Sequence, residues 1–213
     1  MNVGDVPRVE RSSPPMNSIF LPSACLVIAA LAVPMGLQWN TTSVSWTEPA
    51  GVTSGTVSES LVPSEFFAVQ ALKLWDFDGR ACSLQLEQGN FNTPSSRPLD
   101  PVRFCEPKQT QAWKRADIGL GQFVTAISVC TALKDQGAQI HGVELWGAAL
   151  DSAGKLKPAK QSVKLELAHC EKWSTRRTCP AGSVATGVRA HLGDSDAGAI
   201  GLALRCHKLS ATP

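Results

Sequence analysis

A repeat of about 60 residues is the feature that most constrains the fold of this chain. Residues 122–129 align with residues 183–190 at an offset of 61, and seven of the eight pairs match in size or polarity. A second match, residues 142–146 with residues 201–205, follows at an offset of 59. A more divergent copy begins at Phe67. Because a unit of this size cannot bury an apolar face alone, three such units must pack around a common core.

Within the units, apolar and polar residues alternate with a period of two, as in residues 71–75, 83–87 and 163–167. Clusters of Gly, Pro, Asn and Asp separate the alternating runs, as in residues 76–79 and 151–154. Alternation predicts strands with one buried face, and the clusters supply turns. The sequence therefore predicts an all-β domain over residues 66–213, with repeats at residues 66–112, 113–172 and 173–209.

The N-terminal region is predicted to be a signal peptide over residues 1–36. Residues 25–32 form a short apolar core, two arginines precede it, and residues 30–32 offer an Ala-Leu-Ala cleavage site. Cleavage is expected at that triplet or near Gly36. An uncleaved membrane anchor is the alternative, and a start at Met16 remains open.

The segment between the leader and the repeats, residues 37–65, is rich in Ser, Thr, Gly and Pro with isolated valines. Such composition is typical of loops and linkers. We therefore expect a flexible, extended lead-in here.

The cysteine count indicates an oxidising compartment. One of the seven cysteines, Cys25, lies in the leader, which leaves an even set of six. An even set behind a secretory signal favours disulfides and a secreted, extracellular protein, or a periplasmic one in a bacterium. Reduced cysteines in the core are the alternative. The six are Cys82, Cys105, Cys130, Cys170, Cys179 and Cys206.

The last repeat carries a series of short motifs. Trp173 is followed by Cys-Pro-Ala-Gly at residues 179–182, an acidic turn at residues 193–196 and a closing Arg205-Cys206. In this order the motifs resemble the repeat of the vitelline membrane outer layer protein I family, and the resemblance is best over residues 113–206. It implies a signal peptide and a β-prism, in which three antiparallel sheets surround a pseudo-threefold axis.

The resemblance has departures that bear on the disulfides. The second unit lacks Cys-Pro and has Trp146 where the family has cysteine, so the bond within that unit is absent. What the resemblance implies is one bond, Cys179 to Cys206. Proximity in sequence suggests two further pairs as hypotheses, Cys82 with Cys105 and Cys130 with Cys170.

Tryptophans are the best candidates for sugar binding, because a flat apolar face with a polar edge suits a glycan ring. The chain has no Tyr, and Trp75, Trp146 and Trp173 are the candidates, of which Trp75 and Trp146 are assigned to the predicted site. Trp113 and Trp173 occupy equivalent positions 60 residues apart, which favours a structural role in the core for both.

Asp194 and Asp196 complete the predicted ligand-binding set, since one loop presents both carboxylates. The alternative is a turn in which both side chains cap local backbone amides. Glycoside hydrolysis requires two carboxyl groups across a cleft, and no such pair stands out in the sequence.

Several function classes have no support in the sequence. With 20 Lys and Arg against 18 Asp and Glu, and no basic run, nucleic acid is an unsuitable partner. The cysteine spacing does not suit zinc, and no nucleotide-binding glycine motif is present. A calcium loop starting at Asp76 is excluded, because Arg80 and Ala81 stand where the loop requires an oxygen ligand and a glycine. We therefore expect no metal, cofactor or nucleotide.

These observations favour a secreted, non-catalytic protein that binds glycans or builds an extracellular coat or matrix, as the resemblance implies. Two alternatives stay open. One is a carbohydrate-active enzyme on N-acetylated glycans, an activity the resemblance also implies. The other is a lectin-like receptor-binding module of a toxin or adhesin, by fold analogy.

Overall fold

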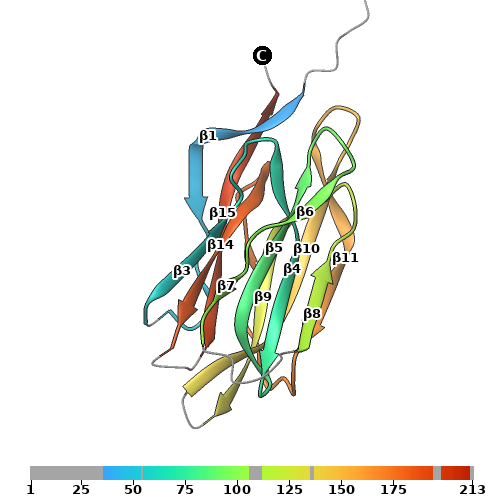
Figure 1. Ribbon diagram of the computed structural model, residues 1–213. Coiled ribbons are helices and arrows are strands. Elements are labelled where there is room, and N and C mark those ends of the chain that lie inside the picture. Colours follow the sequence, from blue (N-terminus) through green and yellow to red (C-terminus); the bar gives the residue numbers. More distant parts are fainter. Residues whose placement is uncertain (1–35, 54, 106–111, 135–136, 194–197, 212–213) are drawn as a thin grey trace, which may run out of the picture. The chain divides into compact units, whose positions relative to one another are not determined.

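Strands are the only regular elements in the part of the chain that the structure describes. This computed structural model describes residues 36–53, 55–105, 112–134, 137–193 and 198–211, and assigns 15 strands to them. The strands form three antiparallel sheets, each built on one long hairpin (Figure 1). This arrangement confirms the predicted all-β fold.

Sheet I is built on the hairpin of β4 (Phe67–Phe77) and β5 (Arg80–Asn90). Its strand order is β6-β5-β4-β8, with β6 at Ser96–Pro98, β8 at Ala112–Asp117, and β7 (Val102–Arg103) also paired with β5. The turn follows the expected chemistry, since Asp78 and Gly79 have φ angles of 53° and 80°, as a tight two-residue hairpin turn requires. The Asp76 carboxylate accepts a hydrogen bond from the Gly79 amide at 2.7 Å.

Sheet II is built on the hairpin of β9 (Gln122–Lys134) and β10 (Gly137–Leu150). Its order is β11-β10-β9-β12, with β11 at Leu156–Glu166 and β12 at Lys172–Trp173, and β13 (Arg177–Thr178) also pairs with β9. Sheet III is built on β14 (Ser183–Leu192) and β15 (Ala199–Ala211). Its order is β1-β15-β14-β3, with β1 at Leu37–Trp46, β3 at Val57–Leu61, and β2 (Ala50–Gly51) also paired with β15.

The three sheets bury their apolar faces against one another. Each sheet contributes fully buried side chains to one continuous core, and the outward-facing positions between them are largely polar. The core includes Leu72, Leu74 and Leu84 of sheet I, Ile127, Val129 and Leu145 of sheet II, and Val188, Leu202 and Leu204 of sheet III.

The expectation of a flexible lead-in over residues 37–65 is wrong, because this segment supplies β1, β2 and β3 of sheet III. Sheets I and II take their outer strands from residues that follow the hairpin, whereas sheet III takes them from residues that precede it (Figure 1). Trp39 anchors β1. Its ring is 8% exposed, lies 4.1 Å from the His207 ring, and donates from Nε1 to the Phe67 carbonyl at 3.0 Å.

The sheet boundaries also differ from the repeat boundaries. Trp113 lies in β8, opposite Trp75 of sheet I, and Trp173 lies in β12, opposite Cys130 of sheet II. Each of the tryptophans that opened a repeat in the sequence therefore belongs to the last part of the preceding sheet. The leader, residues 1–36, lies outside the described residues except for Gly36.

Three disulfides join the cysteine pairs that the sequence suggested: Cys82 with Cys105, Cys130 with Cys170, and Cys179 with Cys206. The third bond links the segment after β13 to β15, and so connects sheets II and III. Among the described residues, no helix has the length and apolar character of a membrane span, and no group of three or more His, Cys, Asp or Glu side chains is placed to hold a metal.

Candidate functional site

The outer face of sheet II carries an aromatic and charged surface. In β10, Val143 and Leu145 point into the core, so Glu144 and Trp146 point outward. Lys164 of β11 lies opposite Glu144, and its ammonium is 3.7 Å from the Glu144 carboxylate. The Ser162 hydroxyl donates to the same carboxylate.

Trp173 lies on this same face. It pairs with Cys130 of β9, and the Lys164 ammonium lies 4.8 Å from its ring centroid. Because Lys164 and Trp173 come from the two opposite edges of the sheet, their side chains reach toward each other over β10 and β9. Those two strands present small residues at this level, among them Ser128 and Gly142.

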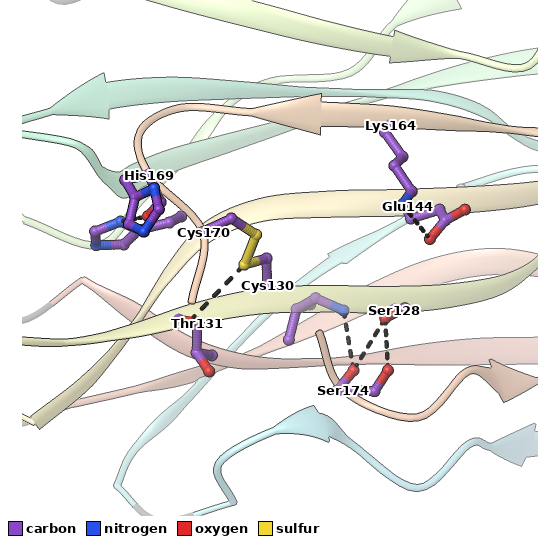
Figure 2. The surroundings of a disulfide bond; sticks show 10 residues. Ser128, Cys130, Thr131, Glu144, Lys164, His169, Cys170 and Ser174 are labelled. Carbon is purple, nitrogen blue, oxygen red and sulfur yellow. Dashed lines mark hydrogen bonds and ion pairs between the residues drawn. A yellow bond between two sulfur atoms is a disulfide. The ribbon is translucent and has the colours of Figure 1, made fainter. Parts of the chain in front are cut away.

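The segment that carries Trp173 is fastened to β9 on both sides. Before Trp173, the Cys130–Cys170 disulfide joins it to the strand, as Figure 2 shows. After Trp173, the Ser128 hydroxyl donates to the Ser174 carbonyl at 2.9 Å, and the Ser174 hydroxyl accepts from the Val129 amide at 3.1 Å (Figure 2). These contacts fasten the backbone segment that carries the indole, which reduces the ordering entropy that a ligand must overcome.

A groove of about 360 Å³ adjoins Trp173 at the junction of sheets II and III. One wall is β12, β13 and the residues between them, and the other is the segment around β2. The groove is lined by Pro49, Gly51, Val52, Thr131, Lys172, Trp173, Ser174, Thr175 and Arg177. We name it the Trp173 groove.

Two features bring the walls together. The Arg177 guanidinium donates from Nε to the Pro49 carbonyl at 3.3 Å, and from Nη1 to the Glu48 carboxylate at 2.6 Å. Gly51 allows β2 to approach, since a Cβ built there would lie 2.5 Å from the Ile200 carbonyl oxygen and 3.0 Å from Val129 Cγ2. Gly51 also has a φ of +94°, which side-chain-bearing residues rarely adopt.

The lining of the Trp173 groove combines three chemistries. Trp173 contributes to the lining from the outer face of sheet II, where it pairs with Cys130. Lys172 and Arg177 bring positive charge from the opposite face, where they pair with Thr131 and Ile127. Thr131 and Thr175 add hydroxyl-bearing side chains. This combination suits a small polar ligand with one apolar face and several hydroxyl groups.

Sheet I carries a separate aromatic cluster. Trp75 and Trp113 are direct cross-strand partners, and the Lys73 ammonium lies 5.3 Å and 4.0 Å from their ring centroids. Trp113 is 53% exposed, so the expectation that it belongs to the core is wrong. Trp173 is half-buried on the outer face and does not belong to the core either.

The structure does not bring the predicted site residues together on one sheet. Trp75 lies in β4 of sheet I and Trp146 in β10 of sheet II, where the Arg176 guanidinium lies 4.7 Å from the Trp146 ring centroid. Asp194 and Asp196 lie outside the described residues. Of the three candidate tryptophans, Trp173 lines the groove, whereas Trp75 and Trp146 do not.

Sequence reasoning missed the groove's second wall. Residues 49–52 lie more than 120 positions before Trp173, in the segment expected to be flexible. The signal in the sequence was limited to the run from Lys172 to Arg177, which combines one aromatic residue with hydroxyl-bearing and basic residues.

Comparison with known proteins supports the fold. No protein-family model and no curated protein sequence matches the chain. Similar solved structures are lectins. Single-chain recombinant jacalin has a TM-score of 0.51 at 9% identity, and the match covers 78% of this chain and 95% of that chain. Frutalin from Artocarpus incisa has a TM-score of 0.51 at 8% identity, and the match covers 78% of this chain and 97% of that chain. The Calsepa lectin, solved with a bisected glycan, has a TM-score of 0.50 at 10% identity and covers 75% of this chain and 95% of that chain.

Such low identity shows the fold alone. The three curled antiparallel sheets of this chain match the β-prism of these lectins, which confirms the predicted architecture. The closer resemblance to the vitelline membrane outer layer protein I family stays a prediction.

Proposed function

We propose that this protein is a secreted, non-catalytic glycan-binding protein, and that the Trp173 groove is its sugar site. The observation that carries the proposal is that half-buried Trp173, on a segment fastened to β9, lines a groove of about 360 Å³ together with hydroxyl-bearing and basic residues. A pyranose can stack its C–H face on the indole while its hydroxyls bond to Thr175 or to other hydroxyl-bearing residues of the lining.

The groove distinguishes Trp173 from the other partly exposed indoles, since all of them, Trp173 with Lys164 at 4.8 Å included, have a cation near the ring. Lysine or arginine of this chain lies 4.0 Å from the ring centroids of Trp113 and Trp46, and 4.7 Å from that of Trp146. A ligand must displace those cations or use the opposite ring face. Trp173 also has a cation near one face, but it contributes to the wall of the groove as well.

Two further observations support this function. The three disulfides fit an oxidising, extracellular compartment. The similar solved structures are lectins, one of them solved with a glycan. A glycan-binding role of the vitelline membrane outer layer type, within an extracellular coat, is the finer form of the proposal.

The lining favours binding over hydrolysis. Glycoside hydrolysis uses two carboxyl groups that flank the scissile bond. The nine residues that line the groove include no Asp or Glu, and Glu48, which precedes the lining residue Pro49, is paired with Arg177.

A glycan array tests the proposal, with the oxidised protein and two single variants as probes. We expect the native protein to bind a defined set of glycans, Trp173→Ala to lose that binding, and Trp113→Ala to retain it. Trp113 is the matched control because it is a more exposed tryptophan on another sheet. Binding that survives Trp173→Ala, or a blank array with correctly paired cysteines, would contradict the proposal.

A further inference from the structure

We propose that the Trp173 groove prefers acidic sugars, meaning glycans whose terminal pyranose carries a carboxylate or a sulfate. This inference rests on the proposed glycan-binding function and specifies the ligand class. Its basis is the positive charge of the lining, together with the ion pair that Arg177 of the lining already forms with the Glu48 carboxylate.

The lining of the groove is positively charged. It includes Lys172 and Arg177 but no Asp or Glu, although acidic and basic residues are nearly balanced over the whole chain. Lys172 is exposed and has no ion-pair partner among the described residues. A neutral sugar would leave both cations without a counter-charge from the ligand, whereas an acidic sugar would supply one.

Arg177 shows how an acid would be bound. Its Nη1 donates to the Glu48 carboxylate at 2.6 Å, while Nε is directed to the Pro49 carbonyl. The Pro49 contact orients the guanidinium plane, so its Nη edge is presented to an acid. Charged hydrogen bonds of this kind are short and directional, and guanidinium suits both carboxylate and sulfate.

Glu48 is a weak competitor for that edge. Its side chain is 78% exposed, against 34% for Arg177, so solvent screens the ion pair and the glutamate can turn away. A ligand already held by other residues of the groove would bring its acid to Arg177 at a higher effective concentration. Displacement of Glu48 by an acidic sugar therefore costs little.

The arrangement favours a sugar acid over other anions. An inorganic anion would use the cations but leave the indole and the hydroxyls unused. A nucleic acid would require a run of phosphate contacts, and the lining of the groove offers two cations. The combination of ring, hydroxyl and cation within one groove matches an acid on a pyranose.

The experiment compares the same oligosaccharide cores with and without sialic acid, glucuronic acid or sulfate, on one array and then by calorimetry. We expect the native protein to bind the acidic members at least about tenfold more tightly, which is the gain in affinity that one charged hydrogen bond gives. Arg177→Gln should remove that preference and keep binding of neutral members. Glu48→Gln should raise affinity for acidic members about two- to fivefold, the range expected for loss of an exposed ion pair.

Glu59→Gln is the matched control for Glu48. Glu59 pairs with Arg189 at 2.7 Å on sheet III, and neither residue lines the groove, so this change should leave affinity unaltered. Lys172→Gln keeps the test decisive if Arg177→Gln fails to fold, because Lys172 is exposed, and it should weaken acidic ligands about two- to threefold.

The outcomes separate the two proposals. Equal or stronger binding of neutral cores, lost in Trp173→Ala, would overturn the acidic preference and leave glycan binding in place. An acidic preference that survives both Arg177→Gln and Lys172→Gln would place the acid elsewhere and also overturn the inference. The absence of binding to every glycan would overturn both proposals.

Discussion

Lowering the pH from 7 to 5 should destabilise this protein through His207. The residue lies in β15, is fully buried, and stacks on Trp39 of β1. Its Nδ1 lies 2.6 Å from the Thr186 hydroxyl, which can donate in turn to the Arg205 carbonyl at 3.4 Å. In this assignment Nδ1 carries the proton, and the buried Nε2 has no partner among the described residues.

Burial, with a smaller contribution from the Arg205 charge, lowers the pKa of His207 to about 4 from 6.5. The unfolded chain therefore binds more protons than the folded one between those values, and stability falls as the pH drops through this window. The gap between the two pKa values corresponds to about 3 kcal/mol of unfolding free energy. Of this, about 2 kcal/mol should be lost between pH 7 and pH 5.

Urea denaturation at both pH values measures this loss. Other groups titrate as well, among them His191, whose pKa burial also lowers, so the relevant quantity is the change relative to a variant. His207→Gln should reduce the pH-dependent loss by about 2 kcal/mol, whereas His169→Gln, at an exposed histidine, should not reduce it. An unchanged pH dependence in His207→Gln would show that protonation of His207 does not drive the loss of stability.

Three further predictions concern the architecture. Gly51→Ala should lower the free energy of unfolding, measured by urea denaturation, by at least about 2 kcal/mol, because the added Cβ would meet Ile200 and Val129 and φ is positive. Gly121→Ala is the control and should lower it less, since Gly121 also has a positive φ but has open space around it. Removing residues 37–61 should abolish cooperative unfolding in a thermal melt, since sheet III would lose β1, β2 and β3, and a sharp native-like transition would count against this role. Replacing Cys179 and Cys206 together by Ala should lower the free energy of unfolding by about 3 to 4 kcal/mol, the loop-closure entropy for a separation of 27 residues. A loss below about 1 kcal/mol, less than a third of that value, would contradict this expectation.

The features predictable from sequence are those encoded over short distances. The β4–β5 turn could be predicted because Asp76, Asp78 and Gly79 have the chemistry that a tight hairpin turn needs. The hairpin strands could be predicted because each buries alternate residues in one core. The repeat offset identified equivalent strands in sheets II and III for the same reason.

The closure of sheet III could not be predicted in this way. Residues 37–46 contain four large apolar side chains, of which Trp39 alone is buried, and β1 is held by this residue and by pairing with β15. A strand at a sheet edge needs only one anchored side chain and a complementary backbone, which leaves little trace in composition. The same long-range contact places Pro49 and Gly51 against Arg177, so the groove was equally hidden.

The exposure of the tryptophans was also beyond the sequence. Trp113 is equivalent to Trp173 by repeat position, yet only Trp173 lines a groove with the segment around β2. Repeat equivalence fixes the strand on which a side chain lies, whereas its surroundings depend on the neighbouring sheet.

The most direct test of the central claim is a titration of the ¹⁵N-labelled protein with a glycan from the array, followed through the six tryptophan indole signals. Substitution of Trp173 by Phe assigns its signal. We expect the Trp173 signal to shift saturably with ligand, while those of Trp39 and Trp113 stay in place. A saturable shift confined to Trp75 and Trp113, with Trp173 unchanged, would move the sugar site to sheet I and contradict a site at the Trp173 groove.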